Sequence, residues 1–158
     1  MNISVVDIDW QQKNTEWFSI HDETNPDIII ELNMRVLQKQ LNDCNSSRLI
    51  ETIFSNFNLF PNFNTTHLGA PISYQIANIS TVKANEDLLR FRIRVPLMNE
   101  SNNNIYCAFW SFDEQNGTWI TDQTCRFMGY ADDYAQCSCN HFTHFALLIV
   151  SETTNENR

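Results

Sequence analysis

Four cysteines gathered in the last third of the chain constrain its fold more than any other feature. Cys107, Cys125, Cys137 and Cys139 all lie there, and Cys44 is the only other cysteine among 158 residues. Such a cluster favours disulfides in an oxidising compartment and a metal site in a reducing one. Cys137 and Cys139 are a poor pair, because side chains two apart on an extended segment point the same way. Two pairings remain: Cys107–Cys137 with Cys125–Cys139, or the crossed alternative.

Asn-X-Ser/Thr triplets favour a secreted chain, because each is an acceptor for an N-glycan. Six triplets occur, twice the number that we expect by chance even in an Asn-rich sequence, at Asn2, Asn45, Asn64, Asn78, Asn99 and Asn116. Residues 1–9 lack the features of a signal peptide, and no stretch reaches the ~20 apolar residues of a membrane helix. We therefore expect an excerpt of a longer protein, with 151–158 as a polar linker toward a missing membrane segment.

Composition and charge exclude several classes of protein. The chain is 42% hydrophobic, 12% aromatic and 18% charged, which is incompatible with wholesale disorder. Its net charge of −9 argues against a nucleic-acid partner, since phosphate binding needs a basic face. Only 3 Gly are present, so a phosphate-binding loop is not expected.

The hydrophobic pattern predicts a mainly β fold, an antiparallel β-sandwich with one or two short helices. The first 20 residues predict one or two strands, and a β-branched run starts at Ile28 after a turn at 25–27. Apolar residues at helical spacing predict the helices between 32 and 57, followed by a loop over 56–68. Further strands are predicted over 72–80, 88–95, 105–112 and 118–122, the last two joined by a hairpin turn at 113–117.

The segment 142–150 is apolar on both faces. Phe145, Leu147 and Ile149 alternate with Ala146, Leu148 and Val150. A strand without a polar face belongs in the middle of a sheet that is covered on both sides.

The block from Cys107 to Val150 resembles the GPS motif, the last part of the GAIN domain of adhesion G-protein-coupled receptors and polycystin-1-like proteins. The residues that carry the resemblance are Cys107-Ala-Phe-Trp110, Trp119, Cys125 and Cys137-Ser-Cys139-Asn-His141-Phe-Thr143-His-Phe145-Ala. Phe142 stands where the family usually has Leu, and Gln123-Thr124 precedes Cys125 where Gly often stands. The resemblance places a GPS motif at 105–150 within a GAIN-like sandwich subdomain (subdomain B) at 1–150.

The resemblance implies disulfides Cys107–Cys137 and Cys125–Cys139, which leaves Cys44 over. We expect a buried free thiol at Cys44, and the alternative is a disulfide partner in a missing region of the parent protein. It also implies autoproteolysis between Phe142 and Thr143. A Thr hydroxyl needs a base, and His141 lies two residues before Thr143 with an imidazole that titrates near neutral pH. Proximity within one chain would supply much of the rate of an N-to-O acyl shift.

The implied setting is the extracellular side of the cell membrane. The expected partners are the chain's own last strand after cleavage, and the membrane domain and N-terminal ectodomain of the parent protein. In the receptor branch of the family the last strand is a tethered agonist. No cofactor is expected, and the reaction would be a single-turnover self-cleavage rather than enzymatic turnover.

Two alternatives stay open at this point. The first is a structural or adhesive module with the same fold that does not cleave. The second is a zinc site at Cys137, Cys139, His141 and His144, although Cys-x-Cys is a tight spacing for a tetrahedral metal. His144 is expected on the opposite face from His141, as a bystander to the chemistry. Trp110 and Trp119 are expected to serve in the core or an interface.

Overall fold

The structure is a computed structural model, and it describes residues 1–8, 16–21, 23, 25–41, 48–60, 65–77, 79, 82–95, 104–113 and 117–150. Several residues singled out by the sequence lie outside these ranges: Cys44, Asn45, Asn64, Asn78, Asn99, Asn116 and the segment 151–158. Of the six triplets, only Asn2 begins within the described part, where it is exposed on an edge strand.

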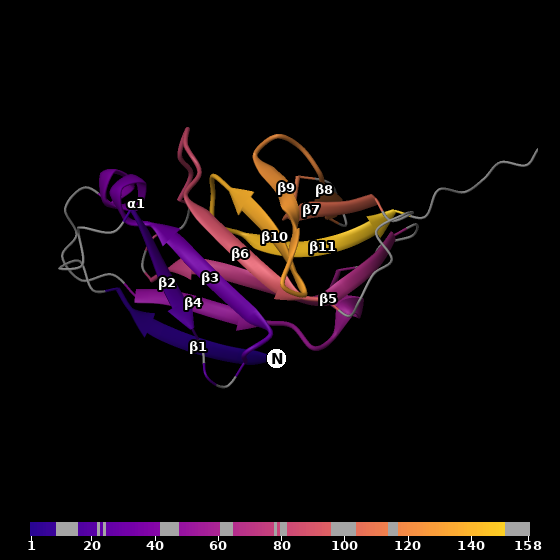
Figure 1. Cartoon of the computed structure of the whole chain (residues 1–158). Coiled ribbons are helices and arrows are strands. Elements are labelled where there is room, and N and C mark those ends of the chain that lie inside the picture. Colours follow the sequence, from indigo (N-terminus) through magenta and orange to yellow (C-terminus); the bar gives the residue numbers. More distant parts are fainter. Residues whose placement is uncertain are drawn as a thin grey trace, which may run out of the picture.

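The chain folds into two antiparallel sheets that pack face to face (Figure 1). The six-stranded sheet has the order β1 (Asn2–Asp7), β4 (Arg48–Ile53), β5 (Thr65–Ile76), β11 (His144–Val150), β7 (Asn104–Ser111), β8 (Thr118–Ile120). The five-stranded sheet has the order β2 (Trp17–His21), β3 (Ile28–Asn33), β6 (Leu89–Arg94), β10 (Tyr134–Cys139), β9 (Cys125–Ala131). This arrangement confirms the predicted mainly β sandwich.

Of the one or two short helices expected between 32 and 57, one is present. Helix α1 (Met34–Gln40) begins after Asn33, whose side-chain oxygen accepts a hydrogen bond of 3.2 Å from the amide of Val36. The helical spacing that starts at Leu49 does not produce a second helix. Leu49, Glu51 and Ile53 are buried in alternation along β4, with only a short 3₁₀ turn, η1 (Phe57–Leu59), after it.

The predicted loop over 56–68 was also wrong at its end, because β5 starts at Thr65 rather than at 72. The pairing of β5 with β11 is shifted by a bulge, since Phe145 is opposite Ile72 while Leu147 is opposite Leu68. Gly69, in this bulge, has a φ of +72°, and a Cβ there would lie 2.8 Å from Cγ2 of Ile93. A stretch with Gly and Pro resembles a loop in sequence, yet the bulge lets the strand continue.

The β9–β10 hairpin was not predicted. Its two-residue turn, Asp132-Asp133, has φ angles of 52° and 65°. Two left-handed residues suit a hairpin of this length, and Asp tolerates that conformation better than most residues. This hairpin supplies three of the four cysteines in the disulfides.

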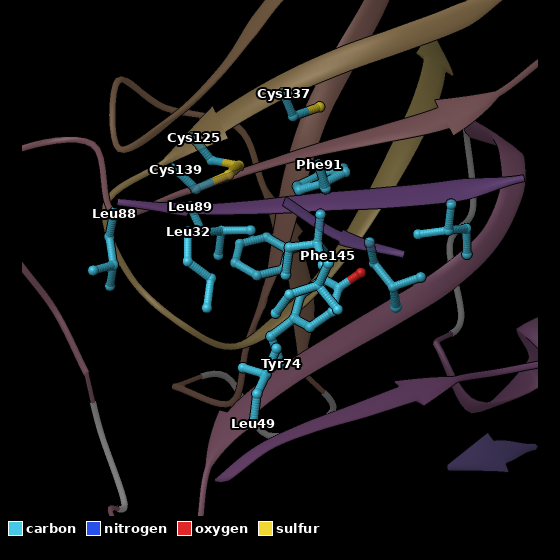
Figure 2. Packing of buried hydrophobic residues seen from close by; sticks show 14 of the residues in the cluster. Leu32, Leu49, Tyr74, Leu88, Leu89, Phe91, Cys125, Cys137, Cys139 and Phe145 are labelled. Carbon is cyan, nitrogen blue, oxygen red and sulfur yellow. A yellow bond between two sulfur atoms is a disulfide. The ribbon is translucent and has the colours of Figure 1, made fainter. Parts of the chain in front are cut away.

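Aromatic rings from both sheets meet at the centre of the sandwich (Figure 2). Phe145 on β11 lies 5.3 Å from Phe91 on β6 and 6.5 Å from Tyr74 on β5, measured between ring centroids. On β6, Phe91 and Ile93 are buried while the intervening arginines point outward, as the alternation predicted. The core therefore has β11 at its middle.

Strand β11 is apolar on both faces, as predicted, and each face is covered. Phe145 and Leu147 belong to the main core, whereas Ala146 and Leu148 pack on the outer side with Ala108 and Trp119. Because β5 and β7 flank it, the strand is also hydrogen-bonded along both edges. No helix among the described residues has the length and hydropathy to cross a membrane.

The two disulfides join different parts of the sandwich. Cys107–Cys137 connects β7 in one sheet to β10 in the other, while Cys125–Cys139 joins directly opposed residues of β9 and β10. This is the pairing that the resemblance implies. Each disulfide has one cysteine on β10, and this strand ends immediately before the segment 140–143.

Candidate functional site

The segment 140–143 crosses from β10 in one sheet to β11 in the other and is held along one side by residues 82–84. The amide of Phe142 donates to the carbonyl of Val82 at 2.9 Å, and the amide of Ala84 donates to the carbonyl of Asn140 at 2.7 Å. Lys83 and His141 are therefore paired in an isolated antiparallel bridge. These hydrogen bonds fix the backbone from Asn140 to the amide of Phe142, just before the Phe142–Thr143 peptide bond.

The peptide bond between Phe142 and Thr143 lies between two fixed points. On its far side, the carbonyl of Thr143 accepts a hydrogen bond of 3.1 Å from the amide of Tyr74 on β5. Within the described part of the chain, no hydrogen bond reaches the Phe142 carbonyl, the Thr143 amide or the Thr143 hydroxyl. The bond is anchored on both sides, and its own polar groups are left available.

His141 is half-buried between two aromatic rings. Its ring lies 4.6 Å from that of Phe109 in an edge-on arrangement and 5.6 Å from that of Phe145. Nδ1 lies 3.0 Å from Oδ1 of Asn140, while Nε2 is buried without a hydrogen-bond partner among the described residues. Within the described part of the chain, one ring nitrogen of His141 is thus hydrogen-bonded and the other is not.

The surroundings of His141 favour its neutral form. Burial lowers the pKa of the imidazole, the positive charge of Lys83 lowers it further, and Asp122 acts weakly in the opposite direction. A neutral imidazole has a lone pair on one nitrogen, and a general base requires that lone pair.

His141, Phe142 and Thr143 share one open cleft of about 350 Å³ at the end of the six-stranded sheet. Its wall includes aromatic residues of β7 and charged residues from three segments. The remaining lining residues are Val82, Lys83, Phe109, Trp110, Ser111, Phe112, Asp113, Asp122 and Thr124. All three residues predicted for catalysis therefore line one cleft that is open to solvent.

His144, by contrast, lies on the outer face of the six-stranded sheet, in the position that the alternation predicted. Its ring is 5.6 Å from Phe54, 5.7 Å from Phe60 and 5.7 Å from Phe112. Trp110 and Trp119 complete this outer aromatic cluster, with ring centroids 5.1 Å apart. Burial lowers the pKa of His144 as well.

The zinc alternative is not supported by the cysteines. Cys137 and Cys139 are both consumed by disulfides and offer no thiolate to a metal. Across the described ranges, no three His, Cys, Asp or Glu side chains are grouped so that they could hold a metal ion.

Several residues of the site were not foreseen. Lys83, Val82 and Tyr74 reach it through backbone pairing from more than 50 positions away, and no local pattern marks them. Asn140 could have been found, because it adjoins His141 and an amide oxygen is a suitable acceptor for an imidazole N–H.

Known proteins that are similar to this chain belong to the family that the sequence motif resembles. A sequence model of the family "GPS: GAIN subdomain B" matches residues 1–153. Mouse adhesion G-protein coupled receptor G4 is 43% identical over 47 residues, which are 28% of this chain and 2% of the receptor. Human adhesion G protein-coupled receptor L4 is 40% identical over 47 residues, 28% of this chain and 7% of the receptor. The matched segments are thus a small part of each relative.

The fold is similar to that of a solved structure, the full extracellular region of zebrafish Gpr126/Adgrg6. The two superpose with a TM-score of 0.60 at 20% sequence identity, covering 88% of this chain and 21% of the other. Since the family model spans nearly the whole sequence, the chain belongs to the GAIN subdomain B family.

Proposed function

We propose that this chain is an extracellular, juxtamembrane autoproteolytic domain that cleaves itself between Phe142 and Thr143. The supporting observation is how the Phe142–Thr143 peptide bond is held by its neighbours. It is anchored by Val82 on one side and Tyr74 on the other, its polar groups are unpaired within the described ranges, and His141 lines the same cleft. Such an arrangement holds reacting groups of one chain together.

The proposed reaction is an N-to-O acyl shift followed by hydrolysis. The Thr143 hydroxyl oxygen attacks the Phe142 carbonyl carbon as Nε2 of His141 takes its proton. The C–N bond then breaks, and the Thr143 nitrogen leaves as an amine after receiving that proton. The resulting ester is attacked by water, which frees the Phe142 carboxylate and restores the Thr143 hydroxyl. Each chain reacts once, so there is no enzymatic turnover.

We expect the two fragments to stay together after cleavage. Strand β11 lies between β5 and β7, and Phe145, Leu147 and Leu148 are almost completely buried. Each buried large apolar side chain contributes about 1.5–3 kcal/mol to retention. If the parent is a receptor, as are the relatives named above, this strand would serve as a tethered agonist once pulled out of the sheet.

The test is expression in a secretory cell followed by denaturing electrophoresis and N-terminal sequencing. We expect two bands from one native particle, the smaller beginning at Thr143. Thr143→Ala should give a single uncleaved band, and Thr121→Ala, which changes an exposed threonine directly after β8, should cleave normally. An uncleaved wild-type chain would instead identify a non-cleaving structural or adhesive module, and cleavage of Thr143→Ala at the same bond would exclude the mechanism.

A further inference from the structure

Asn140 is held by its backbone at the point where β10 leaves the five-stranded sheet. Its amide donates to the carbonyl of Thr124 at 3.0 Å, and its carbonyl accepts from Ala84 at 2.7 Å. The preceding residue, Cys139, is joined to Cys125, the residue after Thr124. The disulfide and both hydrogen bonds therefore fix the backbone position from which the Asn140 side chain extends.

The side chain of Asn140 meets the ring of His141 at Nδ1. The distance from Oδ1 to Nδ1 is 3.0 Å. An amide oxygen has no proton to give, so this contact requires the proton of a neutral imidazole to be on Nδ1. The lone pair is then on Nε2, which is buried and has no hydrogen-bond partner in the described part of the chain.

Among the described residues, no other side chain forms a hydrogen bond with the His141 ring. Its two aromatic contacts, Phe109 and Phe145, offer ring edges and faces rather than acceptor oxygens. The charged side chains around the cleft are Lys83, Asp113 and Asp122. Lys83 is a donor only. Asp113 accepts from Ser111 and Asp122 from Thr124, and within the described ranges neither carboxylate forms a hydrogen bond with the His141 ring.

We infer that Asn140 is a positioning residue that selects the Nδ1-protonated tautomer of His141 and so presents Nε2 as the base. The inference rests on the proposed function for its catalytic consequence, but not for the tautomer itself. Fixing one nitrogen of a histidine so that the other can act is how oriented imidazoles work in general. Asn140 plays this part without a charge, so the imidazole keeps the low pKa that its surroundings favour.

The tautomer can be measured directly, without cleavage. Two-bond ¹H–¹⁵N NMR on the Thr143→Ala chain, labelled at histidine and assigned with His141→Asn, distinguishes the two neutral forms. We expect the Nδ1-protonated form in this background, and a shift toward the Nε2-protonated form in Asn140→Ala. Asn140→Asp should raise the pKa of His141, because a carboxylate favours the imidazolium. Gln136→Ala, which removes another amide from β10, should change neither quantity.

Cleavage kinetics provide the second measurement. With Thr143 intact, we expect pulse-chase cleavage of Asn140→Ala to be about tenfold slower, since only the minor tautomer can act as base. Asn140→Asp should retain cleavage, with its pH dependence displaced to higher pH. Gln136→Ala should cleave at the wild-type rate.

Two results would overturn the inference: the Nε2-protonated form in the Thr143→Ala chain, or a tautomer ratio that does not change in Asn140→Ala. Wild-type cleavage with Asn140→Ala equally fast would refute the catalytic consequence. If the wild-type chain is never cleaved, the proposed function fails, and the NMR comparison still decides whether Asn140 sets the tautomer.

Discussion

His141 and His144, on either side of the candidate cleavage bond, are similar in burial and pKa but differ in the side chains around them. Each is half-buried, each has a pKa lowered by burial, and each has one ring nitrogen without a hydrogen-bond partner within the described ranges. His141 adjoins the core and the cleft, with Asn140 on its other nitrogen. His144 is enclosed by Phe54, Phe60 and Phe112 on the outer face.

The comparison shows that burial and a lowered pKa do not by themselves identify a base. A base also needs an oriented ring and an accessible reacting group. His141 has a hydrogen-bond partner in Asn140 and lines the same cleft as Thr143. Among the described residues, the ring of His144 contacts aromatic side chains and forms no hydrogen bond at Nδ1. His144 is therefore interpreted as a packing residue.

Exchanging each histidine in turn should give the largest contrast. His141→Asn is expected to slow cleavage by about a hundredfold or more, because general-base catalysis is lost. His144→Asn should cleave at close to the wild-type rate. Both are followed by pulse-chase and denaturing electrophoresis, with circular dichroism as the control for folding. Loss of cleavage in a folded His144→Asn chain would contradict the separation of roles.

Removing one aromatic neighbour of each histidine should separate stability from cleavage. Phe60→Ala should lower the free energy of unfolding by about 3 kcal/mol, because a buried ring is replaced by a cavity. It should leave cleavage unchanged, since Phe60 contacts His144 and does not line the cleft.

Phe109→Ala is the matched variant on the other side. We expect a comparable loss of stability, measured by urea denaturation, together with slower cleavage, because His141 loses one wall of its site. Equal cleavage in both variants would show that the packing of His141 has no influence on the reaction.

The smallest expected effect is a decline in stability at mildly acidic pH. Each histidine has a lower pKa in the folded chain than the ~6.5 of an unfolded one, so the unfolded state binds protons first as pH falls. Stability should be full above about pH 6.5 and decrease below it, down to the folded pKa values. Denaturation midpoints in His141→Asn and His144→Asn should each show a weaker decline, and an unchanged decline in both would refute this origin.

The sequence was a good guide wherever one local pattern had one structural solution. The alternation of Phe91 and Ile93 with arginines predicted β6. The two apolar faces of 142–150 predicted a central strand, which the structure forms over His144–Val150. The sequence was a poor guide where its apolar residues fit both the helical period of 3.6 and the strand period of two. Leu49, Ile50 and Ile53 suit a helix by spacing, but Glu51 is buried beside them in β4, so the period is two. Which residues are buried decides between helix and strand for this segment. That burial depends on β1 and β5, which flank β4 in the sheet.

What the sequence determined by itself is the chemistry available: four cysteines for two bonds, and a His-Phe-Thr step before an apolar strand. Only the tertiary structure decided how that chemistry is arranged. Val82, Ala84 and Tyr74 hold the segment around the Phe142–Thr143 bond through backbone hydrogen bonds, in which any residue but proline can donate. Backbone pairing leaves no signature in side-chain identity, so a site built from distant strands becomes visible only in the folded chain.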